Sequence, residues 1–239
     1  MSSLLMTGFP GFLASALVPR ILARRDGVDA ICVVQSHHLP LAVERVAEIE
    51  AAHPHTEGRI SLVTGDITAP GLGVDASERA RLQDVQEVWH LAAVYDLAVP
   101  EEIARRVNVQ GTANVIEFAR SRTEFQRLQY VSTCYVSGDY DGEFPEDEID
   151  LGQGFLNHYE STKFEAEVLV RRAIRAGLPA TIYRPGIVVG DSVTGETQKY
   201  DGPYFYATYI QRIPGVALIP GVGDFDVVRA GLVPRDYVI

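Results

Sequence analysis

Ser3-Leu-Leu-Met-Thr7-Gly8-Phe-Pro-Gly11-Phe-Leu-Ala14 is the stretch that decides the fold. It predicts a short apolar strand, a sharp turn and then a helix. Gly8 permits backbone angles that a side chain would forbid, Gly11 lets the main chain approach a ligand, and small Ala14 lets the helix pack closely. The first N–H groups of a helix have no partner within it and attract a diphosphate. We therefore expect a dinucleotide site lined by Thr7, Gly8, Pro10, Gly11, Phe12 and Leu13.

Short β-branched runs alternate with amphipathic stretches along most of the chain, which is typical of a parallel sheet covered by helices on both faces. The expected strands lie at about 3–6, 30–35, 59–64, 87–91, 128–132 and 180–184. The expected helices are 12–24, 41–52, 101–120 and 156–176, and Gly177 marks the end of the last one. The predicted fold class is α/β, a doubly wound parallel sheet of the Rossmann type.

The composition of the sequence changes after Arg184, where Gly, Pro and aromatic residues become frequent. We therefore expect a dinucleotide-binding domain over 1–184 and the start of a small substrate-binding lobe over 185–239, which ends in an apolar run and is expected to be truncated. The lobe contains an aromatic cluster, which predicts either a channel for an acyl chain or the core of the lobe. Its members are Tyr200, Tyr204, Phe205, Tyr206 and Tyr209.

Composition excludes several classes of protein. The net charge of -11 argues against binding to nucleic acid, which requires a face rich in Lys and Arg. The two cysteines, Cys32 and Cys134, indicate neither a disulfide framework nor a metal site, so a cytoplasmic location is expected. No apolar run reaches the length of a membrane span, and no basic residue precedes the first apolar run as in a signal peptide.

The ends of the expected strands carry further candidate ligands, because ligands of an open parallel sheet bind at the carboxyl ends of its strands. The second strand ends at Gln35 and Ser36 without the acid that usually holds the ribose of NAD. This absence favours NADPH over NADH, with NAD as the open alternative. The other candidates at strand ends are Asp66 and Ile67 after the third strand and Leu91, Ala92 and Ala93 after the fourth.

Tyr159-Glu-Ser-Thr-Lys163 places a phenol and an ammonium on the same face of an expected helix. A phenol is a poor proton donor at neutral pH unless its pKa falls, and a close ammonium can lower the pKa. Thr133 follows the strand that carries Tyr130 and is placed to hold a carbonyl oxygen. The pattern predicts reduction of a carbonyl group, with the acidic run 139–150 as a solvated loop over the mouth of the site.

Six motifs together resemble the extended short-chain dehydrogenase/reductases: TGFPGFLA, GDIT, HLAA, NVQGT at 108–112, STCYVSG at 132–138, and YESTK. The segment from Arg184 to Gly195 and the segment 233–237 resemble the branch of fatty acyl-CoA reductases and thioester reductase domains. This resemblance implies a catalytic triad of Thr133, Tyr159 and Lys163, with Asn108 supporting a water-linked proton path. It also implies cofactor contacts from Tyr159, Lys163, Pro185, Gly186 and Val188, and a possible homodimer.

The expected function is therefore NAD(P)H-dependent reduction of a small-molecule carbonyl, an acyl thioester or an aldehyde. Two alternatives stay open, an extended-type dehydrogenase or epimerase acting on another substrate such as a nucleotide sugar, and a catalytically silent cofactor-binding protein. The chain begins directly at the first expected strand, so a freestanding enzyme is expected rather than part of a larger synthetase.

Overall fold

The chain divides into two compact units, Met1–Pro185 and Gly186–Ile239, in a computed structural model. The structure describes residues 2–198, 200, 202–213, 215 and 231–239. The division falls one residue after the expected domain boundary, and the binding role of each unit stays a prediction.

A six-stranded sheet forms the centre of the first unit, with the order β3-β2-β1-β4-β5-β6. All of its neighbouring strands are parallel. The order reverses between β1 and β4, which is where an open sheet of this kind leaves a crevice for a ligand. The doubly wound fold is thereby confirmed. The strands are β1 (Ser2–Thr7), β2 (Val28–Val34), β3 (Ile60–Thr64), β4 (Val85–His90), β5 (Arg127–Val131) and β6 (Ala180–Tyr183).

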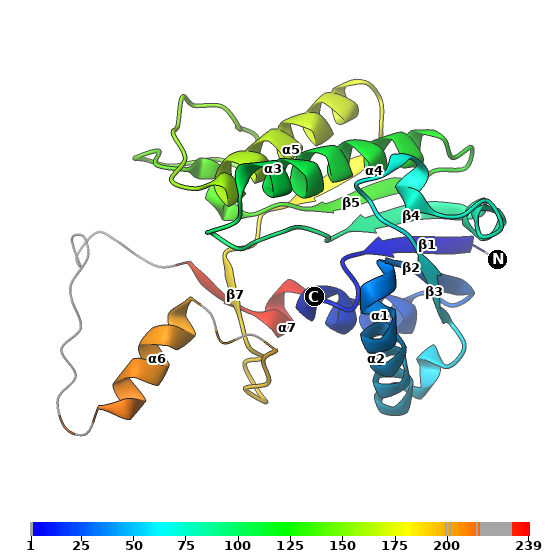
Figure 1. The fold of residues 1–239 in the computed structure, drawn as a ribbon, viewed down its shortest axis with the longest axis horizontal. Coiled ribbons are helices and arrows are strands. Elements are labelled where there is room, and N and C mark those ends of the chain that lie inside the picture. The colour runs from blue at the N-terminus through cyan, green and yellow to red at the C-terminus, as the bar shows by residue number, and fades with distance from the viewer. Residues whose placement is uncertain (1, 199, 201, 214, 216–230) are drawn as a thin grey trace. The chain divides into compact units, whose positions relative to one another are not determined.

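Helices cover both faces of this sheet (Figure 1). On one face lie α1 (Phe12–Arg24) and α2 (Leu39–Ala52), and on the other lie α3 (Glu101–Ala104), α4 (Gly111–Arg120) and α5 (His158–Arg175). The helix expected over 101–120 is confirmed, but a π-helical turn, η5 (Arg105–Gln110), joins α3 to α4 and was not foreseen. Gly177 ends the α5 region with φ at +92°, an angle that favours glycine.

Short 3₁₀ turns connect these elements. They are η1 (Ser36–His38), η2 (Pro54–Thr56), η3 (Pro70–Gly73), η4 (Arg79–Leu82) and η6 (Cys134–Ser137). Two of them, η1 and η6, begin within three residues of the carboxyl ends of β2 and β5 and therefore lie at the ligand-binding edge of the sheet.

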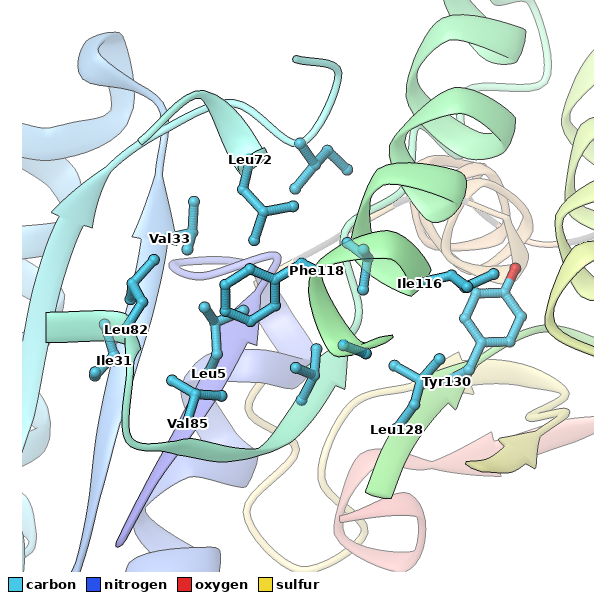
Figure 2. Close-up of a cluster of buried hydrophobic side chains, with 14 of the residues drawn as sticks. Leu5, Ile31, Val33, Leu72, Leu82, Val85, Ile116, Phe118, Leu128 and Tyr130 are labelled. Atoms are coloured by element: carbon cyan, nitrogen blue, oxygen red, sulfur yellow. The ribbon is translucent and has the colours of Figure 1, made fainter. Parts of the chain in front are cut away.

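Alternate residues of β1 pack into two separate cores. Leu4 and Met6 join a cluster with residues of α1 and α2, whereas Leu5 joins a cluster with residues of α4 and α5. This division follows from the two-residue period of a strand, which sends successive side chains to opposite faces. Figure 2 shows part of the second cluster, in which Phe118 lies among aliphatic side chains and Tyr130 lies beside Ile116.

The second unit contains a parallel pair of strands, β7 (Ile187–Val189) and β8 (Leu232–Pro234), and two helices, α6 (Pro203–Arg212) and α7 (Arg235–Val238). The aromatic residues in and before α6 do not form a packed core among the described residues. Only Tyr204 is partly buried, and its hydroxyl accepts from the Gly190 N–H at 2.7 Å. The exposed members are Tyr200, Phe205, Tyr206 and Tyr209.

Among the residues with a described placement, no helix is both long enough and apolar enough to cross a membrane.

Candidate active site

The loop between β1 and α1 leaves no room for a side chain at Gly8 or at Gly11. A Cβ on Gly8, where φ is +89°, would lie 2.8 Å from the nitrogen of Ala92, and a Cβ on Gly11 would lie 2.6 Å from the Gly8 oxygen. The N–H of Ala92 donates to the Thr7 hydroxyl at 3.2 Å. Helix α1 has Gly11 at its N-cap and no side-chain capping bond. A bare loop before an uncapped helix fits the diphosphate of a dinucleotide.

Thr7 connects this loop to a buried chain of hydrogen bonds. Its hydroxyl lies 2.7 Å from Nδ1 of His90, and Nε2 of His90 lies 3.0 Å from the Thr112 hydroxyl. That hydroxyl donates to the Asn108 carbonyl at 2.6 Å, so its proton is not available to His90. His90 therefore donates from Nε2 and accepts at Nδ1. Burial, with a smaller contribution from Lys163, lowers the pKa of His90 to about 3, so the imidazole is neutral.

Asn108, in the π turn η5, ties the chain after β4 to α5. Its Oδ1 accepts from the Val94 N–H at 2.9 Å, and its Nδ2 donates to the Val94 carbonyl and to the Thr162 hydroxyl, both at 3.0 Å. Thr162 directly precedes Lys163. The structure thus places Asn108 as a support for helix α5, and its part in a water-linked proton path stays a prediction.

The carboxyl ends of β2 and β3 meet through Gln35 and Asp66. Nε2 of Gln35 donates to Oδ2 of Asp66 at 3.0 Å, and the Thr68 N–H donates to Oδ1 at 2.8 Å. Partial burial by itself raises the pKa of Asp66, but these hydrogen bonds and the charge of Arg106 outweigh it and lower the pKa. Asp66 is therefore ionised and fixed beside the end of β2, where sequence reasoning expected the adenosine of the cofactor.

The other predicted cofactor residues of the first unit lie at the same edge of the sheet. Ser36 begins the exposed turn η1, and the Ile67 carbonyl accepts from Nδ2 of Asn114 at 2.7 Å. The Pro185 carbonyl accepts from the Cys134 N–H at 3.0 Å, beside Thr133. Partly buried positions at the ends of β1 and β4 belong to Pro10, Phe12, Leu13, Leu91, Ala92 and Ala93.

Thr133, Tyr159 and Lys163 meet where β5 ends. The Thr133 hydroxyl lies close enough to the Tyr159 phenol to lower its pKa. The Lys163 ammonium donates to the Tyr130 hydroxyl at 3.1 Å and to the Val131 carbonyl at 2.9 Å. Among the hydrogen bonds of the described residues, none joins Lys163 to Tyr159. The structure therefore brings the three predicted catalytic residues together, with the ammonium directed toward the strand.

The electrostatics of this cluster differ from our expectation. The pKa of Tyr159 is raised rather than lowered, because burial of the phenol outweighs the opposite effect of the nearby Thr133 hydroxyl. Burial also lowers the pKa of Lys163 to about 7, although the charge of Glu167 opposes this shift. The sequence shows the one-turn spacing of the pair but not how completely α5 and β5 exclude water from it, and desolvation disfavours the charged form of both groups.

Two further side chains adjoin the pair. Tyr135 contacts Tyr159 edge to face, with ring centroids 6.4 Å apart. Burial raises the pKa of the neighbouring Cys134 thiol, which disfavours the thiolate that a nucleophile requires.

The sequence did not lead us to predict a charged cluster next to Lys163. Glu167 lies one turn after Lys163 on α5 and binds Ser132, Arg171 and Arg184. The acidic run 139–150, expected to be a solvated loop, has exposed carboxylates, but its backbone is anchored through both arginines. Four-residue spacing from Lys163 was the available signal for Glu167, whereas nothing local in the sequence indicated the partners.

In the second unit, the two segments that resemble the reductase branch in sequence are joined by hydrogen bonds. Asp236 accepts from the Ser192 N–H and from the Ser192 hydroxyl, both at 2.7 Å. Gly186 and Val188 also belong to this unit, and their contact with a cofactor stays a prediction.

Comparison with known proteins places the chain. The sequence profile of the family described as "Male sterility protein" matches residues 6–239. One of the subunits of linear gramicidin synthase from Brevibacillus parabrevis is 30% identical over 210 residues, covering 82% of this chain and 4% of that protein. The fatty acyl-CoA reductase wat of Drosophila melanogaster is 28% identical over 272 residues, covering 98% of this chain and 52% of that protein.

A solved structure is similar to this chain in both fold and sequence. The terminal R domain from the myxalamid PKS-NRPS biosynthetic pathway has a TM-score of 0.81 and 30% identity, covering 100% of this chain and 60% of that one. The chain thus spans only part of the length of these relatives. The chain belongs to the male sterility family of NAD-binding domains, within the extended short-chain dehydrogenase/reductases.

Proposed function

We propose that this chain carries out NADPH-dependent reduction of an acyl thioester or an aldehyde. The observation that carries the proposal is the meeting of three residues at the end of β5. The Thr133 hydroxyl lies close enough to the Tyr159 phenol to lower its pKa, and buried Lys163 donates to the Val131 carbonyl. This cluster follows β5, at the same edge of the sheet as the glycine loop after β1. The name of one relative, fatty acyl-CoA reductase, supports a thioester as substrate.

Each group has a role in this reaction. NADPH, when bound, supplies a hydride to the carbonyl carbon. Thr133 holds the carbonyl oxygen and Tyr159 gives it a proton, while the Lys163 ammonium stabilises the phenolate that remains. With a thioester, the product of the first transfer is a hemithioacetal, which collapses to an aldehyde and a free thiol. A second round on the aldehyde would give the alcohol.

The cofactor would lie across the reversal of strand order. Gly8, Gly11 and the first turn of α1 hold the diphosphate, and Gln35 and Asp66 lie at the adenosine end. The two residues that follow β2 are Gln35 and exposed Ser36, and neither is an acid. We therefore expect NADPH to bind more tightly than NADH, as measured by titrating the fluorescence of each reduced cofactor with purified protein.

The decisive variant is Tyr159→Phe, which removes only the proton donor. We expect turnover to fall by about 10²- to 10⁴-fold, because this is the usual contribution of a positioned acid. The dissociation constant of NADPH should change less than about twofold. Tyr135→Phe is the matched control, since its ring contacts Tyr159. An unchanged rate in Tyr159→Phe would refute the assigned role.

A substrate screen separates the remaining alternatives. NADPH oxidation would be followed with acyl-CoAs, with long-chain aldehydes and with nucleotide sugars. Activity on nucleotide sugars alone would replace our proposal with the dehydrogenase or epimerase alternative. Tight NADPH binding without turnover on any of them would favour a silent cofactor-binding protein.

We also infer the roles of the two units, the oligomeric state and the location of the protein. The first unit binds the dinucleotide and the second contacts the substrate. Helices α4 and α5 form a two-fold interface in a homodimer, which light scattering on the eluted protein would test. The protein acts in the cytoplasm, which localisation of a tagged full-length chain would test.

A further inference from the structure

Glu167 is a fully buried acid that the proposed reduction does not use. Its side chain has no exposed surface, and it accepts from the Ser132 hydroxyl at 2.6 Å, from Arg171 Nε at 2.8 Å and from Arg184 Nη2 at 2.7 Å. Burial by itself would raise the pKa of Glu167, but the bonds from these three residues, led by Arg184, outweigh it and lower the pKa. The carboxylate is therefore charged and fully paired.

One stripe of α5 contacts three consecutive residues at the end of β5. Tyr159, Lys163 and Glu167 recur every four residues and so lie on the same face of the helix. Lys163 donates to the Val131 carbonyl, Glu167 accepts from the Ser132 hydroxyl, and Tyr159 lies near the Thr133 hydroxyl, which lowers its pKa. The bond from Glu167 reaches the residue directly before Thr133, so it fixes the register between the catalytic helix and the turn that carries Thr133.

The two arginines extend this contact to the loop before α5. Arg184 donates to the carbonyls of Pro145 and Glu148, at 3.0 and 2.6 Å. Arg171 donates to the carbonyls of Glu146 and Asp147, at 2.6 and 2.8 Å. Four consecutive carbonyls are thus held by cations that are themselves held by Glu167. The loop is anchored by its backbone, while its carboxylates face water.

We propose that Glu167 is a positioning residue for the reduction: it holds Thr133, through Ser132, in register with Tyr159 and Lys163, and it fastens segment 145–148 to the same helix. The effect of Glu167 on the reaction rate rests on the proposed function. Its effect on the structure does not, because that effect can be measured on the chain without substrate.

The carboxylate also acts on Lys163 across one helical turn. The titratable and charged groups that face Lys163 are His90 from β4, Tyr130 from β5 and Glu167 on α5 itself, and Tyr159 lies one turn earlier on the same helix face. Those that face Glu167 are Arg171 on α5, Arg184 after β6 and Tyr130. Glu167 is the anion in this set that keeps Lys163 protonated, against the effect of burial.

The kinetic test compares Glu167→Gln with Glu165→Gln, a control on the same helix whose acid pairs with Arg105 at the surface. We expect Glu167→Gln to lower kcat about tenfold or more, with KM for NADPH within about twofold, since the bonds of Glu167 go to Ser132, Arg171 and Arg184 and not to the glycine loop. The decline of activity with rising pH should move to lower pH, because Lys163 loses its proton more readily. A purely structural role would lower activity without moving the pH profile.

The structural test measures amide hydrogen exchange in the full chain without cofactor. Exchange should quicken at Cys134, Val136 and Glu148, whose N–H groups are bonded at these two segments, and stay unchanged in β2. Glu167→Asp should restore part of the protection. Unchanged exchange together with kcat within about twofold of the wild type would overturn the proposal.

Two milder variants decide the matter if Glu167→Gln does not fold. Ser132→Ala should quicken exchange at Cys134 and Val136 alone, and Arg171→Gln should quicken it at Glu148 alone. If neither does so, the proposal is wrong. If the wild type reduces no carbonyl compound while these exchange effects appear, the proposed function fails and the positioning role of Glu167 stands.

Discussion

Two buried polar networks hold α5, and they differ in charge. The first runs from Thr7 through His90 and Thr112 to Asn108 and then Thr162, and each of its members is neutral. The second gathers Ser132, Arg171 and Arg184 around the Glu167 carboxylate. Lys163 lies between the two, because its charge acts on His90 and is itself affected by Glu167.

Because the two networks differ in charge, their stability depends on different conditions. A neutral network depends on the direction of its hydrogen bonds, so it specifies one tautomer of His90 and one orientation of each hydroxyl. A charged network depends on complete pairing, because a buried charge left without its partner is costly. We therefore expect the charged network to be the less tolerant of substitution.

Arg184→Gln should have the largest effect on stability. It leaves the Glu167 carboxylate short of a partner and releases two loop carbonyls. The free energy of unfolding should fall by about 3 to 5 kcal/mol, as when one partner of a buried pair is removed. Urea unfolding measures this, with exposed Arg127→Gln as control. Equal losses in the two variants would contradict the distinction between the networks.

The pH dependence of stability tests the lysine between the networks. Burial lowers the pKa of folded Lys163 to about 7 from its ordinary 10.5, so above pH 7 the folded protein lacks a proton that the unfolded chain holds. Its contribution to the free energy of unfolding should rise between pH 7 and 9, by about 2 kcal/mol, because stability rises where the unfolded state binds more protons. Lys163→Met should lack this rise, and parallel pH curves for the two proteins would exclude it.

His90→Leu should have a smaller effect. It removes the imidazole that links the hydroxyls of Thr7 and Thr112, and buried groups left without a partner cost about 2 kcal/mol. The matched control is His55→Leu, because His55 is exposed and makes one bond, to the Pro19 carbonyl. Nitrogen NMR shifts of the wild-type ring should show a neutral Nε2–H form throughout pH 5 to 8. Titration within that range would show that the network is not neutral.

Glu165→Gln should have the smallest effect, below about 0.5 kcal/mol, because exposed ion pairs contribute little. Glu165 pairs with Arg105 at 2.6 Å, but about half of the Arg105 side chain is exposed. Added salt should remove the difference between this variant and the wild type. A loss as large as that of Arg184→Gln would mean that burial does not decide the cost.

Much of the fold was predictable because its signals are local. The helix over 12–24 agrees with α1, since its apolar spacing and the glycine turn before it are contiguous in sequence. The helix over 101–120 was predicted as one regular element, and the π turn was missed. That turn brings Asn108 to Val94 and Thr162, which are distant in sequence from each other, so no local pattern reports it.

The candidate site also combines a feature that the sequence predicted with one that it did not. The spacing of Tyr159 and Lys163 correctly indicated that they share a helix face, yet the direction of the Tyr159 pKa shift was wrong. A pKa depends on the water that the surrounding elements exclude, and that exclusion arises from β5 and α5 together.

The sequence by itself determined the order of strands and helices, the glycine loop and the one-turn spacing of Tyr159 and Lys163, because each depends on neighbours along the chain. Only the tertiary structure decided that His90 is neutral, that Lys163 contacts Tyr130 and Val131, and that Glu167 gathers its three partners. The physical reason is that burial and hydrogen bonding are set by residues that come together only when the sheet and its helices have packed.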